Sequence, residues 1–141
     1  MGLRQRGLVP ATSRRLLQAA IAIGGLVPVA AGLTGMILGP SFMADQSYAV
    51  SADSHVRYLS GLLAAIGVAF WATIPAIERH AARFRLLTAL VVAGGIGRLI
   101  SLLTVGVPSP SMLFGLVMEL AVTPALCLWQ GALAARWRGR G

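Results

Sequence analysis

The chain has 141 residues, of which 57% are hydrophobic and only 11% are charged. Soluble domains usually carry about 25% charged residues, so this composition excludes an ordinary soluble domain and indicates a membrane protein. The net charge is +8, and every basic residue is an arginine.

Four apolar runs follow one another along the chain, at about residues 16–38, 56–77, 86–107 and 112–135. Each is close to the roughly 20 residues that a helix needs to cross a bilayer. None alternates apolar and polar residues as the strands of a membrane barrel do. We therefore expect helices, which satisfy their own backbone groups in lipid. Residues 1–13 and 136–141 are expected to be tails of a transmembrane domain at 14–135.

The connections between the runs are short, so sequential helices are expected to be antiparallel. The longest connection covers residues 39–55, and the last is a Pro-rich turn at 106–111. The sequence therefore predicts an all-α fold, an antiparallel bundle of four transmembrane helices in a single domain.

The arginines predict the orientation of this bundle. Three segments on one side of it are rich in arginine, namely the N-terminal tail, the second connection and the C-terminus (Arg4, Arg6, Arg14, Arg15, Arg79, Arg83, Arg85, Arg136, Arg138 and Arg140). The other side holds Asp45, Asp53, His55 and Arg57. By the positive-inside rule we expect both termini in the cytoplasm, with the protein in a bacterial inner membrane. The orientation of the chain in the membrane thus accounts for its positive charge, and no nucleic-acid partner is expected.

Small residues recur at four-residue spacing on two of the expected helices, as Ala31, Gly35 and Gly39 and as Ala89, Ala93, Gly97 and Ser101. Helices in lipid associate through close backbone contact, so we predict that both stripes are packing faces. A stripe that lines a substrate path is the alternative. Pro28 and Pro124 are expected to bend their helices, because proline lacks a backbone donor.

Two charged residues, Arg98 and Glu119, fall inside apolar runs. A charge at the bilayer centre costs roughly 2.5–3.5 kcal/mol on insertion scales, so such residues are kept away from lipid. Arg98 lies eight residues before Gly106, and Glu119 lies seven residues after Met112. At about 1.5 Å per residue, both side chains lie roughly 10–12 Å from the same end of the bundle. We therefore predict an Arg98–Glu119 ion pair.

The second helix is expected to start at that same end, with Asp53 as its N-cap and as a partner for Arg57 one turn later. We predict one polar cluster in the outer half of the bundle, made of Asp53, His55, Arg57, Arg98 and Glu119. The cluster is either a structural clamp and helix cap or a binding site for a small polar or amphiphilic ligand, with His55 available for proton transfer.

Other chemistry is sparse. Cys127 is the only cysteine, which excludes an internal disulfide and a cysteine-built zinc site. His55 and His80 lie far apart and predict no metal site. The sequence has no phosphate-binding loop, dinucleotide fingerprint or nucleophile elbow. We expect no cofactor, and an enzyme is less expected than a binding protein.

Three stretches resemble an uncharacterised bacterial membrane family, domain of unknown function 4345, a relative of the DoxX-like four-helix proteins. They are residues 53–61 (DSHVRYLSG), residues 94–101 (GGIGRLIS), and Glu119-Leu120 with Pro124 and Leu128-Trp129-Gln130. The resemblance extends over residues 16–133 and implies a four-helix membrane protein. It implies no activity, substrate or cofactor, but it also singles out Asp53, Arg57, Arg98 and Glu119.

Three functional hypotheses follow from the sequence. The first is an inner-membrane protein that binds or handles a small lipophilic or amphiphilic molecule in an outer-leaflet polar pocket. The second is an accessory or assembly subunit of a larger membrane complex, with another membrane protein or a second copy as its partner. The third is a small proton-coupled exporter, in which Glu119 is the membrane carboxylate.

Overall fold

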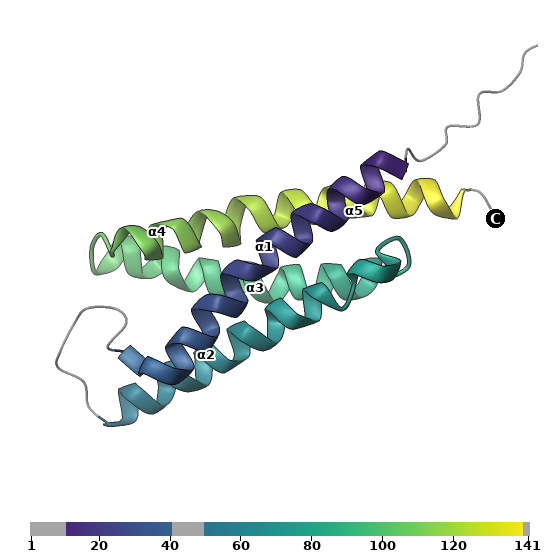
Figure 1. Cartoon of the computed structure of the whole chain (residues 1–141). Helices are drawn as coiled ribbons and strands as arrows, with labels where there is room; N and C mark the ends of the chain where they lie inside the picture. Colours follow the sequence, from purple (N-terminus) through teal and green to yellow (C-terminus); the bar gives the residue numbers. More distant parts are fainter. Residues whose placement is uncertain (1–10, 41–49, 140–141) are drawn as a thin grey trace, which may run out of the picture.

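The computed structural model describes residues 11–40 and 50–139, which form four long antiparallel helices (Figure 1). The elements in chain order are α1 (Ala11–Leu38), α2 (Val50–Trp71), the short 3-10 helix η2 (Ile74–Ala76), α3 (Ala81–Thr104), and then α4 (Pro110–Val117), the π-helical turn η3 (Met118–Val122) and α5 (Thr123–Arg138). The last three follow one another without a break as the fourth long helix. This confirms the all-α prediction for the described part of the chain. Arg4, Arg6, Asp45 and Arg140 lie outside it, as does most of the expected N-terminal tail.

All four helices are long and apolar enough to cross a membrane. The protein is therefore a multi-pass membrane protein. The first three helices begin several residues before the apolar runs that predicted them, at Ala11, Val50 and Ala81, because a helix can continue into polar surroundings while it satisfies its own backbone. The regular part of α2 ends at Trp71, one α-helical turn before Pro75, whose ring would clash with the Trp71 carbonyl.

The helices α1 and α2 pack against each other through glycines. A Cβ added to Gly32 would lie 2.6 Å from the backbone nitrogen of Ala64 and 2.6 Å from the carbonyl oxygen of Ser60. Gly35 is also buried, which confirms one position of the packing face predicted for the first helix, whereas Gly39 lies just after the end of that helix. The contact is backbone on backbone, the kind that holds helices together in lipid.

The stripe predicted on the third helix meets no other helix in the part of the chain that the structure describes, so the prediction that it packs inside the bundle was wrong. Its members Ala89, Ala93, Gly97 and Ser101 are all exposed. The close contact of α3 is made instead by Gly95, where an added Cβ would lie 2.7 Å from Leu120 Cδ2 and 3.0 Å from Glu119 Cβ. Several small residues are available on this helix, and their spacing does not determine which of them faces the neighbour.

The apolar core lies at one end of the bundle, and we call this the basic end because Arg14, Arg79, Arg83, Arg85, Arg136 and Arg138 lie there. The rings of Phe70 and Phe84 meet edge to face with their centroids 4.9 Å apart. Buried Gln130 donates to the carbonyl oxygen of Ile77 at 2.7 Å. Because the turn after α2 leaves backbone carbonyls without helical partners, such side chains complete their hydrogen bonding.

At the basic end, α1 also holds the connection between α2 and α3. Arg14 Nε lies 3.0 Å from Glu78 Oε2, and Gln18 donates to the Ile74 carbonyl oxygen at 2.7 Å. Toward the opposite end, which we call the open end, the pair α1/α2 diverges from the pair α3/α4 (Figure 1). The bundle is thus closed by packing and hydrogen bonds at one end and separated into two pairs at the other.

Candidate functional site

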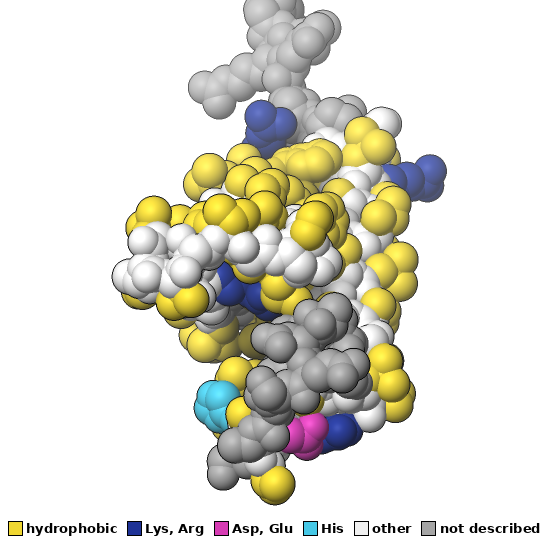
Figure 2. All heavy atoms as spheres, turned by 90° about the vertical axis from the view of Figure 1, so that its left-hand side faces the viewer, with side chains coloured by type: hydrophobic (Ala, Val, Ile, Leu, Met, Phe, Trp, Pro, Cys, Tyr) yellow, Lys and Arg dark blue, Asp and Glu magenta, His cyan; other side chains and the backbone are white. Residues whose placement is uncertain are grey.

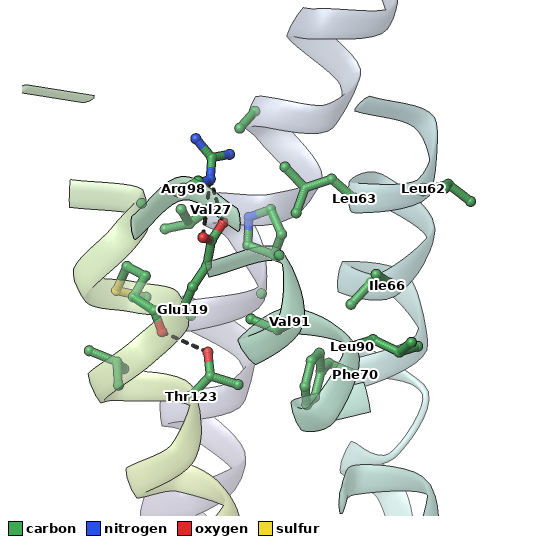
Figure 3. A pocket seen from close by; sticks show the side chains of 18 of the residues that line it. Val27, Leu62, Leu63, Ile66, Phe70, Leu90, Val91, Arg98, Glu119 and Thr123 are labelled. Carbon is green, nitrogen blue, oxygen red and sulfur yellow. Dashed lines mark hydrogen bonds and ion pairs between the residues drawn. The ribbon is translucent and has the colours of Figure 1, made fainter. Parts of the chain in front are cut away.

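A cavity of about 770 Å³ lies between the two helix pairs (Figure 3). Pockets that hold small molecules in proteins measure roughly 300–1,000 Å³, so this volume suits a ligand of that size. All four long helices contribute to its wall, which is mostly apolar and includes Val27, Leu63, Ile66, Leu90 and Val91. Phe70 and Phe84 line its inner part and also belong to the core at the basic end.

Arg98 and Glu119 stand in this apolar wall and form an ion pair, which confirms the prediction from their depth. Arg98 Nε donates to Glu119 Oε1 at 3.1 Å and lies 3.1 Å from Oε2 as well. The glutamate side chain is 13% exposed and the arginine side chain 36%. Viewed onto the open end, a basic side chain lies in a hollow between apolar ones (Figure 2). The carboxylate is thus held inside the bundle while the guanidinium reaches toward the opening.

Glu119 lies in the π-helical turn η3, which the sequence reading did not predict. The backbone N–H of Thr123 reaches back to the Met118 carbonyl oxygen, which also accepts from Thr123 Oγ1 at 2.8 Å. Pro124 explains the widening, because its ring would clash with the carbonyl of Leu120 in a regular α-helix. A π turn holds an extra residue and is frequent at functional sites. Here it shifts the side chains before it, Glu119 included, around the helix axis.

Asp53 and Arg57 form a second ion pair, away from the cavity. Arg57 Nε lies 2.8 Å from Asp53 Oδ2, and Arg57 Nη1 donates to the carbonyl oxygens of Met36 at 2.7 Å and Ile37 at 2.8 Å. These carbonyls belong to the last turn of α1 and have no partner further along their helix. The pair therefore joins the end of α1 to the first turns of α2.

Close packing of this joint requires the glycine that follows α1. Gly39 has a φ of 59°, and a Cβ added to it would lie 2.5 Å from Asp53 Oδ1. Asp53 itself lies inside the first turn of α2, which begins at Val50, so the prediction that it is the N-cap was wrong. The helix extends further toward the open end than its apolar run, and the carboxylate still lies near the positive end of the helix dipole.

The five residues predicted as one cluster thus occupy separate places. Arg98 and Glu119 line the cavity, Asp53 and Arg57 join α1 to α2, and His55 is exposed on α2. The prediction grouped these residues because all lie in the half of the bundle near one end, but position along a helix does not determine which face of the helix a side chain occupies.

A substitution at the joint tests its role. We expect Arg57→Gln to lower the thermal midpoint of the detergent-solubilised protein, because the α1 carbonyls and Asp53 lose their donor. Binding in the cavity should not change, because Arg57 does not line it. His55→Ala is the matched control on the exposed face of the same helix and should leave both measurements unchanged. If the folded Arg57→Gln protein no longer bound a molecule in the cavity, Arg57 would belong to the binding site after all.

Comparison with known families agrees with the sequence resemblance. Residues 16–130 match a family described as a domain of unknown function (DUF4345). The protein belongs to the DUF4345 family. No match was found among curated proteins or among solved structures. The matched segment includes the Asp53–Arg57 and Arg98–Glu119 ion pairs and all the residues of the cavity wall, whereas a relation to the DoxX-like proteins stays a prediction.

Several cavity residues of this DUF4345 protein were not singled out from the sequence. Met112 lines the wall, and its sulfur accepts from Arg98 Nη1 at 2.9 Å. Gly94 also lines the cavity, and an added Cβ there would meet no atom within 4 Å. In the sequence, the available signal for the widened turn η3 was Thr123 followed by Pro124. Across residues 11–40 and 50–139, no group of three His, Cys, Asp or Glu is placed to hold a metal ion.

Proposed function

We propose that this DUF4345 protein binds a lipophilic or amphiphilic small molecule in the cavity between its two helix pairs, within a bacterial inner membrane. The described arginines near helix ends gather at the basic end, so the positive-inside rule supports a cytoplasmic basic end with both termini. The cavity, which lies beyond the core toward the open end, then belongs to the outer leaflet.

The observation that carries this proposal is an apolar cavity whose wall residues are also exposed at the protein surface. Leu59, Leu62, Leu90 and Phe114 line the cavity, yet each is about half exposed. A cavity of this kind is accessible from the hydrocarbon of the bilayer and does not suit water, which needs polar partners. Molecules dissolved in the membrane are therefore its natural occupants.

Two glycines on α3 allow a matched test. Gly94 lines the cavity and Gly97 does not, and a Cβ at either meets no atom within 4 Å. We expect Gly94→Phe to place an aromatic ring in the cavity and to lower labelling by a photoreactive long-chain lipid analogue in nanodiscs, read by intact-protein mass spectrometry. Gly97→Phe adds the same ring outside the cavity and should label like the natural sequence. Equal labelling of both variants would contradict the proposal.

An accessory role in a membrane complex is a second candidate. The exposed face of α3 with Ala89, Ala93 and Gly97 suits close contact with another helix. Disulfide crosslinking of an Ala93→Cys variant, with Cys127 replaced by serine, would detect a second copy in the native membrane. An exporter receives less support, because both oxygens of the proposed proton carrier Glu119 lie 3.1 Å from Arg98 Nε.

A further inference from the structure

The guanidinium of Arg98 is only partly used by the protein. Its Nε faces Glu119, its Nη1 donates to the Met112 thioether, and its Nη2 has no hydrogen-bond partner among the described residues. Arginine carries five N–H donors, and a thioether is a weak acceptor. In Figure 3 the two terminal nitrogens point away from the carboxylate of Glu119. Of the two terminal nitrogens, Nη1 is therefore held only by a weak acceptor and Nη2 by none of the described residues, while Nε is engaged by Glu119.

An open guanidinium fork in an apolar wall has a defined chemical preference. Unsatisfied donors are costly where water is scarce, and the planar fork of arginine matches the two oxygens of a carboxylate or phosphate. The rest of the cavity offers apolar surface, which extends from the fork to Phe70. The site thus combines one anion-binding element with a long apolar wall.

We propose that the ligand is an amphiphile with an acidic head, a carboxylate or a phosphate, that accepts hydrogen bonds from Nη1 and Nη2 of Arg98 while its apolar tail lies along the cavity. This inference rests on the function proposed above and names its ligand class. Nη1 leaves the Met112 sulfur for the stronger acceptor. Charge complementarity selects the head, and the apolar wall selects the tail.

Glu119 is a positioning residue in this arrangement. Its carboxylate holds Nε, so the guanidinium plane is oriented before the ligand arrives. Its negative charge also opposes a second anion on the same cation. We therefore expect Glu119→Gln to strengthen the preference for an acidic head, because the amide oxygen still accepts from Nε but carries no charge.

The experiment compares three photoreactive probes with the same long alkyl tail and different heads, namely a carboxylate, a phosphate monoester and a primary alcohol. The protein is held in nanodiscs of zwitterionic phosphatidylcholine, and labelling above that of the Gly94→Phe variant is measured by intact-protein mass spectrometry. We expect each acidic probe to label at least about ten-fold more efficiently than the alcohol, the effect of one charge-assisted contact. Preference between the two acidic heads shows which of the two anions the site favours, and either preference supports the proposal.

Substitutions at Arg98 separate the head from the tail. Arg98→Lys keeps the charge but lacks the fork, and should reduce the ratio of acidic to alcohol labelling, whereas Glu119→Gln should raise it. The double variant Arg98→Gln/Glu119→Gln removes both charges and should bring the ratio close to that of the probes' partition into empty nanodiscs. A purely structural ion pair would alter thermal stability in these variants without moving the ratio.

The possible results are distinguishable. If all three probes label equally and Gly94→Phe blocks each of them, the acidic head is refuted while the cavity function stands. If no probe labels above the Gly94→Phe background, the proposed function itself fails. If the ratio stays high in the folded double variant, the head binds elsewhere and the assignment to Arg98 is overturned.

Discussion

Replacing Arg98 alone by glutamine should destabilise the folded protein more than replacing Arg98 and Glu119 together. The single change leaves the Glu119 carboxylate, 13% exposed, without its cation inside the bundle. Removal of one partner of a buried ion pair costs about 3–5 kcal/mol, and we expect the lower end because Arg98 is 36% exposed. The free energy of unfolding in mixed micelles measures the loss. The double variant, with two neutral amides, should recover most of it.

With the single variant Glu119→Gln added, these proteins form a double-mutant cycle that measures the coupling between the two residues. If the single variant is as stable as the natural sequence, the carboxylate does not depend on the guanidinium, and the pair is not a structural element. The natural protein, Glu119→Gln and the double variant also serve in the labelling experiment, so that the stability of the ion pair and the choice of ligand head can be measured separately.

Gly32→Val should separate α1 from α2. A Cβ added to Gly32 would lie 2.6 Å from two backbone atoms of α2, the nitrogen of Ala64 and the carbonyl oxygen of Ser60. Backbone cannot turn aside as a flexible side chain can, so the helices must move apart. We expect a loss in unfolding free energy of at least about 3 kcal/mol, the upper end of overpacking costs, measured in the same micelles.

The matched control is Gly97→Val, which places the same side chain on an exposed position where an added Cβ meets no atom within 4 Å. It should be as stable as the natural sequence. Equal stability of Gly32→Val and Gly97→Val would contradict the close backbone contact between α1 and α2. The cavity should also lose its shape in Gly32→Val, because α1 and α2 form one of its two sides.

The linear order of the sequence was enough to predict the four membrane helices and the height of the charged pair. Apolar length decides whether a segment can cross a bilayer, and the rise of a helix converts residue number into depth. Arg98 and Glu119 could be paired on this basis because they lie at one level on helices joined by a short turn. Residues 53–61, 94–101 and the segment from Glu119 also carried the family resemblance that the comparison confirmed.

The rotation of each helix about its own axis could not be predicted from the sequence. Asp53 and Arg57 were placed near the open end correctly, but their side chains meet the end of α1 and not the cavity. Gly95, and not the stripe through Gly97, makes the contact of α3 with the fourth helix. Neither outcome follows from spacing, because several faces of these helices are equally small or apolar.

The sequence by itself therefore determined the fold class, the four spans and the level of the ion pair. Each of these depends on the length of the apolar runs and on the rise per residue of the helices. Only the tertiary structure decided which faces meet, how the turn before Pro124 widens, and that the two helix pairs separate around a cavity. These features depend on contacts between helices. The backbone of α2 approaches Gly32, the Leu120 side chain approaches Gly95, and Arg57 donates to the last carbonyls of α1, and together these contacts select one rotation among several.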